Sequence, residues 1–278
     1  MCKIYPPRIK NFRDFLIKEL PRVPNNKASR AILQEKPTSK LILYYLTWQM
    51  RFIPAKPRQI TFWSGGITPS ELLTARTGFT EFIQKVATGQ DLTPHLSNLV
   101  RTKGIVMPDA SISEKGKDLD KVLIRHGLHH FHIGEMNAQN PIGRSGTLVF
   151  AEVFEKEFRI IAIADHKAFM IDTKEHKKFS SICYSYLSSQ SSQGFLTNPI
   201  MSSGHSYMIS MYAKQCQKYI ENKDAHLDEN GFIDRLFKGH PVQKPSKPDL
   251  RWYFNDLNLG ILEYRSRSFF CAHSYFNR

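Results

Sequence analysis

The chain has 278 residues, 41% of them hydrophobic and 12% aromatic, with a formal net charge of +14. This composition is typical of a folded globular protein and excludes an intrinsically disordered one. No apolar run approaches the roughly 20 residues that a membrane helix needs, and the four widely spaced cysteines favour a reduced, cytoplasmic protein over a disulfide framework or a cysteine zinc site.

Residues 1–58 hold most of the excess charge, with 13 Lys or Arg residues against three acidic residues. Apolar residues at helical spacing predict helices over 11–20 and 39–48, and prolines then indicate an extended connector over 51–58. Basic segments with interleaved aromatic residues attract the phosphates of nucleic acids. We therefore expect this region to bind nucleic acid, with contacts from Arg51, Lys56 and Arg58.

The segment Thr68-Pro-Ser-Glu71 has the pattern of a helix start, with a capping residue, an early proline and an acid in the first turn. Gly78 is expected to weaken or break that helix, because glycine disfavours helix interiors. Residues 101–120 are polar and rich in turn formers, which indicates a boundary. The predicted domains are a helical basic region over 1–100 and an α+β domain over 101–278.

The middle of the chain changes to the periodicity of strands. A short strand is predicted over 128–133. The apolar runs 147–154 and 158–164 are separated by a short charged turn and predict an antiparallel hairpin. Their near-continuous apolar character indicates a sheet that is buried on both faces.

The C-terminal part is predicted to extend or cover that sheet. The Ser- and Gln-rich segment 185–192 is expected to be a loop, residues 206–219 a helix, and residues 250–270 a second hairpin. The fold class is therefore α+β, with a helical basic N-terminal part, a central antiparallel sheet, and a C-terminal helix and hairpin.

Five of the eleven histidines fall between residues 126 and 166. Because side chains alternate along a strand, His130 and His132 are expected to share one face while His129 lies on the other. One interpretation is that these histidines are hydrogen-bonded structural residues. The other is that two histidines on one face, near basic groups, carry chemistry.

Three kinds of chemistry remain open for the histidines. Zinc binding would need a carboxylate such as Glu135 or Asp165 as a further ligand. A metal-dependent nuclease could use Glu152 with Asp165. The third is acid–base catalysis on RNA, which brings its own 2′-hydroxyl nucleophile and requires no metal or other cofactor. For that chemistry this region also offers cationic and titratable side chains: Arg125, Arg144 and His166.

Two consecutive segments suggest a family. The segment Arg144–Phe154, an arginine followed by an apolar strand, and the segment Phe158–Phe169, a second apolar strand closed by His166, resemble the end of RelE-like toxin domains. Those domains belong to a group of metal-independent ribonucleases related to barnase and the colicin nucleases. The resemblance covers residues 121–170, and this chain differs from those compact domains by long extensions on both sides. It implies that Arg144 binds phosphate and that His166 acts as an acid or base.

The function expected from the sequence is a cytoplasmic, metal-independent endoribonuclease of toxin type that cleaves mRNA or tRNA, with phage defence as one setting. His130 or His132 would be the general base and His166 the general acid, while Arg125 and Arg144 would hold the phosphate. A toxin implies an acidic antitoxin or inhibitor that complements the positive charge. The alternative is a non-catalytic nucleic-acid-binding accessory protein that uses its basic N-terminal region.

Overall fold

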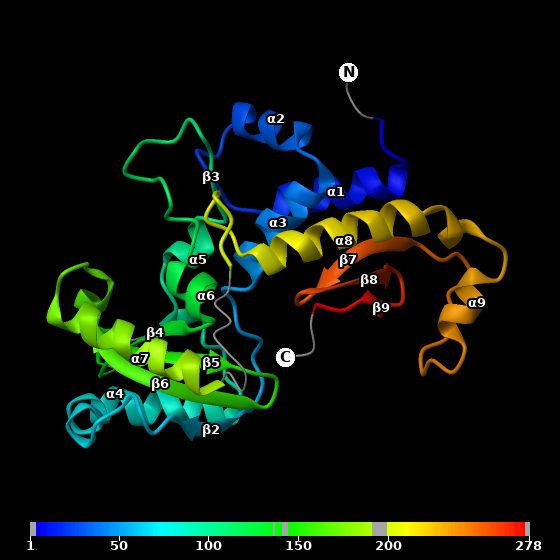
Figure 1. Ribbon diagram of the computed structural model, residues 1–278. Coiled ribbons are helices and arrows are strands. Elements are labelled where there is room, and N and C mark those ends of the chain that lie inside the picture. Colours follow the sequence, from blue (N-terminus) through cyan, green and yellow to red (C-terminus); the bar gives the residue numbers. More distant parts are fainter. Residues whose placement is uncertain (1–3, 136, 141–143, 191–198, 276–278) are drawn as a thin grey trace. The chain divides into compact units, whose positions relative to one another are not determined.

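The computed structural model (Figure 1) describes residues 4–135, 137–140, 144–190 and 199–275, and the chain forms two compact units. Both units are assembled from segments that are separate in the sequence. Unit 1 comprises Met1–Met50, Arg101–Asp118 and Tyr207–Asn277; unit 2 comprises Arg51–Val100, Leu119–Ser206 and the last residue. Helices and strands occur in both units, so the predicted mixed α+β class is confirmed.

A four-stranded sheet in the order β2-β6-β5-β4 organises unit 2. Its strands β5 and β6 form the predicted antiparallel hairpin, in which Thr147 lies opposite Asp165. Strand β4 pairs antiparallel with β5, and β2 is parallel to β6. The bounds are Gln59–Phe62 for β2, His129–Ile133 for β4, Thr147–Val153 for β5 and Glu157–Asp165 for β6.

Helices cover this sheet on both faces, as the apolar strands predicted (Figure 1). On one face, Phe82 of α4 (Pro69–Thr88) packs against Phe131 and Phe158 at ring-centroid distances of 5.1 and 5.8 Å. On the other face, Phe179 of α7 (Lys174–Gln190) lies 4.2 Å from the ring of Phe150. The sheet is therefore the shared core of unit 2.

Two predictions about these helices were wrong. Helix α4 runs unbroken through Gly78. The helix lies against the backbone of Gly134 at this point, and a residue with a side chain would not fit there. Helix α7 extends to Gln190 and so includes most of the segment that was expected to be a loop. Its buried side follows helical spacing, with Phe179, Cys183 and Tyr186 facing the sheet, and this packing outweighs the polar composition of its end.

Short elements complete unit 2. They are the turn η1 (Thr93–His95), the helix α6 (Lys121–His126) and the turn η2 (His166–Phe169). Helix α5 (Leu99–Thr102) spans the boundary between a segment of unit 2 that ends at Val100 and a segment of unit 1 that begins at Arg101. Asp120 begins α6 by accepting a hydrogen bond from the backbone N–H of Leu123 at 3.0 Å, and Gly127 ends the helix in the left-handed conformation.

Unit 1 packs helices against a three-stranded meander. The predicted second hairpin is present as β7 and β8, and β9 adds a third strand beside β8. The bounds are Leu250–Asn255 for β7, Asn258–Glu263 for β8, Ser268–His273 for β9, Pro7–Glu19 for α1, Lys27–Glu35 for α2, Thr38–Gln49 for α3, Tyr207–Lys223 for α8, Ala225–Asp228 for η3 and Phe232–Phe237 for α9. A short parallel pair joins β1 (Arg22–Val23) to β3 (Ile105–Val106).

The two units do not follow the predicted division at residue 100. Residues 51–100 supply the edge strand β2 and the helix α4 to the sheet of unit 2, whereas residues 1–50 pack with the C-terminal segment of unit 1. The first hundred residues therefore divide between two cores. No helix within the described residues combines the length and the apolar character needed to cross a membrane.

Candidate functional site

The histidines of β4 are distributed over the two faces of the sheet. His130 and His132 share one face, with ring centroids 6.2 Å apart, as strand alternation predicted. His129 is buried on the other face, where its ring stacks at 6.3 Å on Phe131. His129 is thus part of the core, and His130 and His132 are the two histidines of β4 that remain candidates for catalysis.

His166 joins this pair from the end of the neighbouring hairpin. The register of β5 and β6 places the start of η2 beside the end of β4, and the rings of His132 and His166 are 5.0 Å apart. The Nδ1 atom of His132 lies 3.5 Å from the carbonyl oxygen of Ser145, and the Nδ1 atom of His166 lies 3.3 Å from that of Gly146. We name His130, His132 and His166 the histidine row.

Asp120 supplies a carboxylate to one end of the histidine row. Its Oδ2 atom lies 3.3 Å from Nδ1 of His130, close enough for an ion pair when the imidazole is protonated. Burial raises the pKa of Asp120, but His130 and the N–H of Leu123 outweigh burial, so the pKa lies below its usual value. Sequence reasoning missed Asp120: its helix-capping position was visible, but the contact with β4 arises only in the fold.

The environment of His132 keeps its imidazole neutral near pH 7. Burial lowers the pKa of His132 to about 4, and the positive charge of Arg144 acts in the same direction. The backbone carbonyl of His132 also lies 2.9 Å from Nδ1 of His95, which ties this end of β4 to η1. His132 is therefore a fixed and unprotonated imidazole.

Arg144, the predicted phosphate ligand, makes structural contacts. Its Nη1 group donates to the carbonyl oxygens of Pro94 at 3.2 Å and Leu96 at 2.7 Å, and to Oδ1 of Asn98 at 3.0 Å. The arginine thus ties the start of the hairpin to the loop around η1. Its charge still reaches the site, because it contributes to the lowered pKa of His132.

The other predicted cationic ligands lie elsewhere. Arg125 is exposed on α6, where its charge adds to the burial that lowers the pKa of His126 to about 4. Arg51 and Arg58 are only 4% and 6% exposed, so neither presents its charge at the surface as expected. Lys56 pairs with Glu155 at 2.5 Å. The basic connector is therefore packed into unit 2 instead of forming an open cationic strip.

Arg58 shows why the connector is packed in this way. Its Nε group donates to the carbonyl oxygen of Phe154 at 2.9 Å, and Nη1 donates to those of Pro54 and Lys56. These carbonyls belong to a proline-rich segment and to a strand end, where the chain supplies few backbone donors. A guanidinium group with five N–H donors satisfies them together.

An exposed aromatic ring lies beside the histidine row. Phe169, at the end of η2, packs edge-on against His130 at 5.2 Å and lies 6.3 Å from His166. Its side chain is 39% exposed although it also contacts Phe150 in the core. Nothing in the sequence alone marked Phe169, because the hairpin must form before η2 faces β4.

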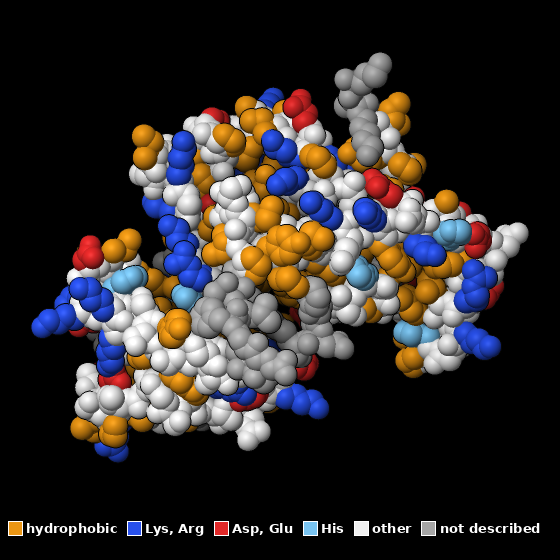
Figure 2. All heavy atoms as spheres, viewed as in Figure 1, with side chains coloured by type: hydrophobic (Ala, Val, Ile, Leu, Met, Phe, Trp, Pro, Cys, Tyr) orange, Lys and Arg blue, Asp and Glu red, His pale blue; other side chains and the backbone are white. Residues whose placement is uncertain are grey.

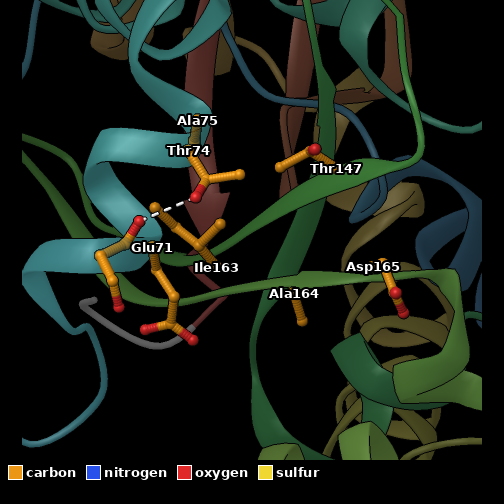
Figure 3. Close-up of a pocket in the computed structure, with 8 residues that line it drawn as sticks. Glu71, Thr74, Ala75, Thr147, Ile163, Ala164 and Asp165 are labelled. Atoms are coloured by element: carbon orange, nitrogen blue, oxygen red, sulfur yellow. Dashed lines mark hydrogen bonds between the residues drawn. The ribbon is translucent and has the colours of Figure 1, made fainter.

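A pocket of about 260 Å³ opens at the same end of the β5–β6 hairpin (Figure 3). Its walls carry two carboxylates, from Glu71 and Asp165, and three hydroxyl groups, from Ser70, Thr74 and Thr147. Figure 3 shows Glu71 and Thr74 on the helix and Thr147 and Asp165 on the strand ends. The pocket lies on the face of the sheet that α4 covers, whereas His130 and His132 lie on the face that α7 covers, so the pocket is separate from the histidine row.

The two metal hypotheses from the sequence find no assembled site. Within the part of the chain that the structure describes, no group of three His, Cys, Asp or Glu side chains gathers as a metal site would require. Glu152 lies opposite Arg159, whereas Asp165 lies opposite Thr147. These carboxylates therefore sit at opposite ends of the hairpin, about five residues or ~16 Å apart along the strand.

The positive charge is divided unequally between the units. Unit 1 holds 24 Lys or Arg residues against 14 acidic residues, and unit 2 holds 15 against 11. On the face drawn in Figure 2, Lys and Arg side chains clearly outnumber Asp and Glu side chains. The histidine row thus belongs to the less charged unit.

Comparison of the chain with known proteins found no match. No protein-family model matches it, and neither the curated proteins nor the solved structures contain a similar chain. The resemblance to RelE-like toxin domains therefore remains a prediction.

Proposed function

We propose that unit 2 is a metal-independent endoribonuclease whose acid and base come from the histidine row. The observation that carries this proposal is the convergence of His132 and His166, whose rings are 5.0 Å apart although they are 34 residues apart in the sequence. Two imidazoles at this separation can act on the two oxygens that flank one phosphorus atom.

The hydrogen bonds of the two rings support a division of labour. A carbonyl oxygen only accepts, so the Nδ1 atoms of His132 and His166 carry the hydrogens that they donate to Ser145 and Gly146. This leaves Nε2 of each ring for proton transfer. His132, with a pKa of about 4, holds a free Nε2 lone pair at neutral pH and is the proposed base.

In the proposed reaction, Nε2 of His132 removes the proton of the RNA 2′-hydroxyl. The 2′-oxygen bonds to phosphorus, the bond from phosphorus to the 5′-oxygen breaks, and protonated His166 gives its proton to that oxygen. The products are a 2′,3′-cyclic phosphate and a 5′-hydroxyl end. His130, whose Nδ1 atom lies 3.3 Å from the Asp120 carboxylate, would in its protonated form stabilise the negative charge that develops on the phosphate oxygens.

The surroundings of the histidine row suit a nucleotide. Phe169 offers an exposed ring on which a base can stack beside His130.

The cellular part of the proposal is growth arrest by cleavage of cellular RNA. The net charge of +14 is complementary to an acidic neutralising protein as well as to RNA. The same charge favours the second candidate function, nucleic-acid binding without catalysis, which would leave the histidine row without a catalytic role.

The test is a double-mutant cycle on RNA cleavage with His132→Ala, His166→Ala and both together. Each single change is expected to lower the rate about a hundredfold or more, and the losses should not add because both groups serve one step. His226→Ala in unit 1 is the control, since that exposed histidine pairs with a neighbouring carboxylate, Glu229, and this variant should keep full activity. If either variant of the row keeps wild-type activity and a wild-type circular dichroism spectrum, the role proposed for that residue is wrong.

A further inference from the structure

The turn between β8 and β9 in unit 1 carries a cluster of arginines around a tyrosine. Tyr264, Arg265 and Arg267 are exposed in this turn. The guanidinium carbon of Arg251, on β7, lies 3.8 Å from the centroid of the Tyr264 ring, and that of Arg267 lies 4.9 Å from it. Three guanidinium groups are thus collected on one edge of the meander.

A buried carboxylate holds this turn in place through hydrogen bonds to the backbone. Glu263 is fully buried and accepts hydrogen bonds from the backbone N–H of Asp249 at 2.8 Å and of Ser266 at 2.6 Å. Burial raises the pKa of Glu263, but these N–H groups outweigh burial and hold the pKa below its usual value. The Glu263 carboxylate is therefore occupied by backbone donors and does not pair with the arginines of the turn.

The charges of the turn are only partly neutralised. Arg251 pairs with Asp249, with Nη2 2.6 Å from Oδ2. Among the described residues no carboxylate lies within ion-pair distance of Arg265 or Arg267, although the charge of Arg265 contributes to the lowered pKa of Asp249. Two guanidinium groups with rigid, planar donor sets thus face solvent from a fixed turn, the arrangement that favours bidentate binding of phosphate.

The backbone of Arg267 adopts a conformation that is unusual for arginine. Its φ angle is +59°, in the left-handed region that costs a non-glycine residue free energy. Glycine takes this conformation at a lower cost, and the guanidinium group of Arg267 lies over the exposed Tyr264 ring.

We propose that this turn, Tyr264–Arg267 together with Arg251, is a phosphate-binding site for the backbone of single-stranded RNA. Arg265 and Arg267 would each bind a backbone phosphate, and Arg251 would hold the Tyr264 ring in place. The choice of RNA as the polymer rests on the proposed function, whereas the binding of phosphate does not. The site belongs to unit 1 and is separate from the histidine row, so it would hold substrate and take no part in the reaction.

The test measures binding of a fluorescein-labelled single-stranded oligodeoxynucleotide to the full chain. This probe has the same phosphates as RNA but no 2′-hydroxyl, so it reports binding whether or not the protein cleaves RNA. The double variant Arg265→Gln with Arg267→Gly is expected to weaken binding at least tenfold. Loss of two phosphate contacts should also reduce the slope of log K against log salt by about 1.4.

Two controls separate binding from folding and from general charge. Arg267→Gly alone should weaken binding without lowering the melting temperature, because glycine suits the positive φ. Arg235→Gln removes an exposed arginine of the same unit, on α9, and should change affinity less than twofold.

Several results would overturn the proposal. They are unchanged binding in the double variant, an equal loss in Arg235→Gln, and binding to vesicles of anionic lipid in place of the oligonucleotide. If the turn variants lose binding but the wild-type protein cleaves no RNA, the site stands and the proposed catalytic function fails.

Discussion

Two histidines of unit 2, His126 and His132, have pKa values that are lowered by their surroundings. The pKa values of His126 and His132 are both lowered to about 4, mainly by burial, while an unfolded histidine titrates near 6.5. Between these values the unfolded chain binds protons that the folded chain does not. Stability is therefore expected to fall as the pH drops from about 6.5 towards 4.

This pH dependence can be assigned to the two histidines. In the double variant His126→Gln and His132→Gln, the urea midpoint should fall less between pH 7 and pH 4.5 than it does in the wild type. For each protein, the urea midpoint at pH 7.5 should equal its midpoint at pH 8.5, because histidine is uncharged at both pH values. A double variant that keeps the full wild-type decline would show that other groups cause it.

The residue-scale predictions from sequence succeeded where a local rule decided the outcome. Strand alternation placed His130 and His132 together and His129 apart. The roles of cationic side chains could not be predicted in the same way. Arg58 donates to the carbonyl of Phe154, and Arg144 donates to those of Pro94 and Leu96, all of them distant in the sequence. The sequence does not show which carbonyls will lack donors.

Among the elements, α4 depends on a close approach to β4 at Gly78. An added Cβ atom would lie 2.5 Å from the backbone of Gly134, far inside van der Waals contact. Helix propensity favours alanine over glycine by about 1 kcal/mol, but the clash acts in the opposite direction. Gly78→Ala is therefore expected to lower the free energy of unfolding by about 1–3 kcal/mol.

The matched control for this element is Gly146→Ala. Gly146 has open space around its Cβ position and no positive φ, so this change should alter stability by less than about 0.5 kcal/mol. Both values come from denaturant unfolding. Stabilisation by Gly78→Ala would mean that α4 and β4 do not pack as described.

The same elements explain the errors made from sequence. Gly78 indicated a weak helix because the pattern does not reveal a neighbouring backbone. The polar end of α7 indicated a loop because Ser and Gln are poor evidence of packing. Phe179, Cys183 and Tyr186 do follow a helical period, but this signal becomes decisive only when the sheet face that they cover is known.

At the scale of the whole molecule, the N-terminal segment holds the C-terminal segment of unit 1 together. Arg8 donates to the carbonyl oxygen of Asp224 at 2.8 Å and of Leu250 at 3.2 Å, and pairs with the Asp224 carboxylate at 3.1 Å. Arg8→Ala is expected to destabilise the protein by about 2 kcal/mol, because it leaves buried acceptors without their donor.

Lys10→Ala provides the comparison for Arg8. Lys10 is on the same helix and makes an exposed ion pair with Asp14, so its loss should cost less than about 0.5 kcal/mol. Thermal unfolding of both variants measures the difference. Equal effects would contradict the view that residues 1–50 and 207–277 form one core.

This organisation also explains why the domain division could not be predicted. The charge concentrated in residues 1–58 does not follow the boundaries of the units, and unit 1 joins residues 1–50 with residues 207–277, more than 150 positions further along the chain. The basic N-terminal region looked like a separate binding arm, but its residues 1–50 build unit 1 and its residues 51–58 pack into unit 2.

The most direct test of the account is the chemistry of the RNA ends produced in the presence of a chelator. Purified full-length protein is incubated with a labelled RNA and excess EDTA, and the products are identified by mass. We expect 2′,3′-cyclic phosphate and 5′-hydroxyl ends from the wild type and at least a hundredfold fewer from His132→Ala. Cleavage that requires added metal, or equal cleavage by His132→Ala, would contradict it.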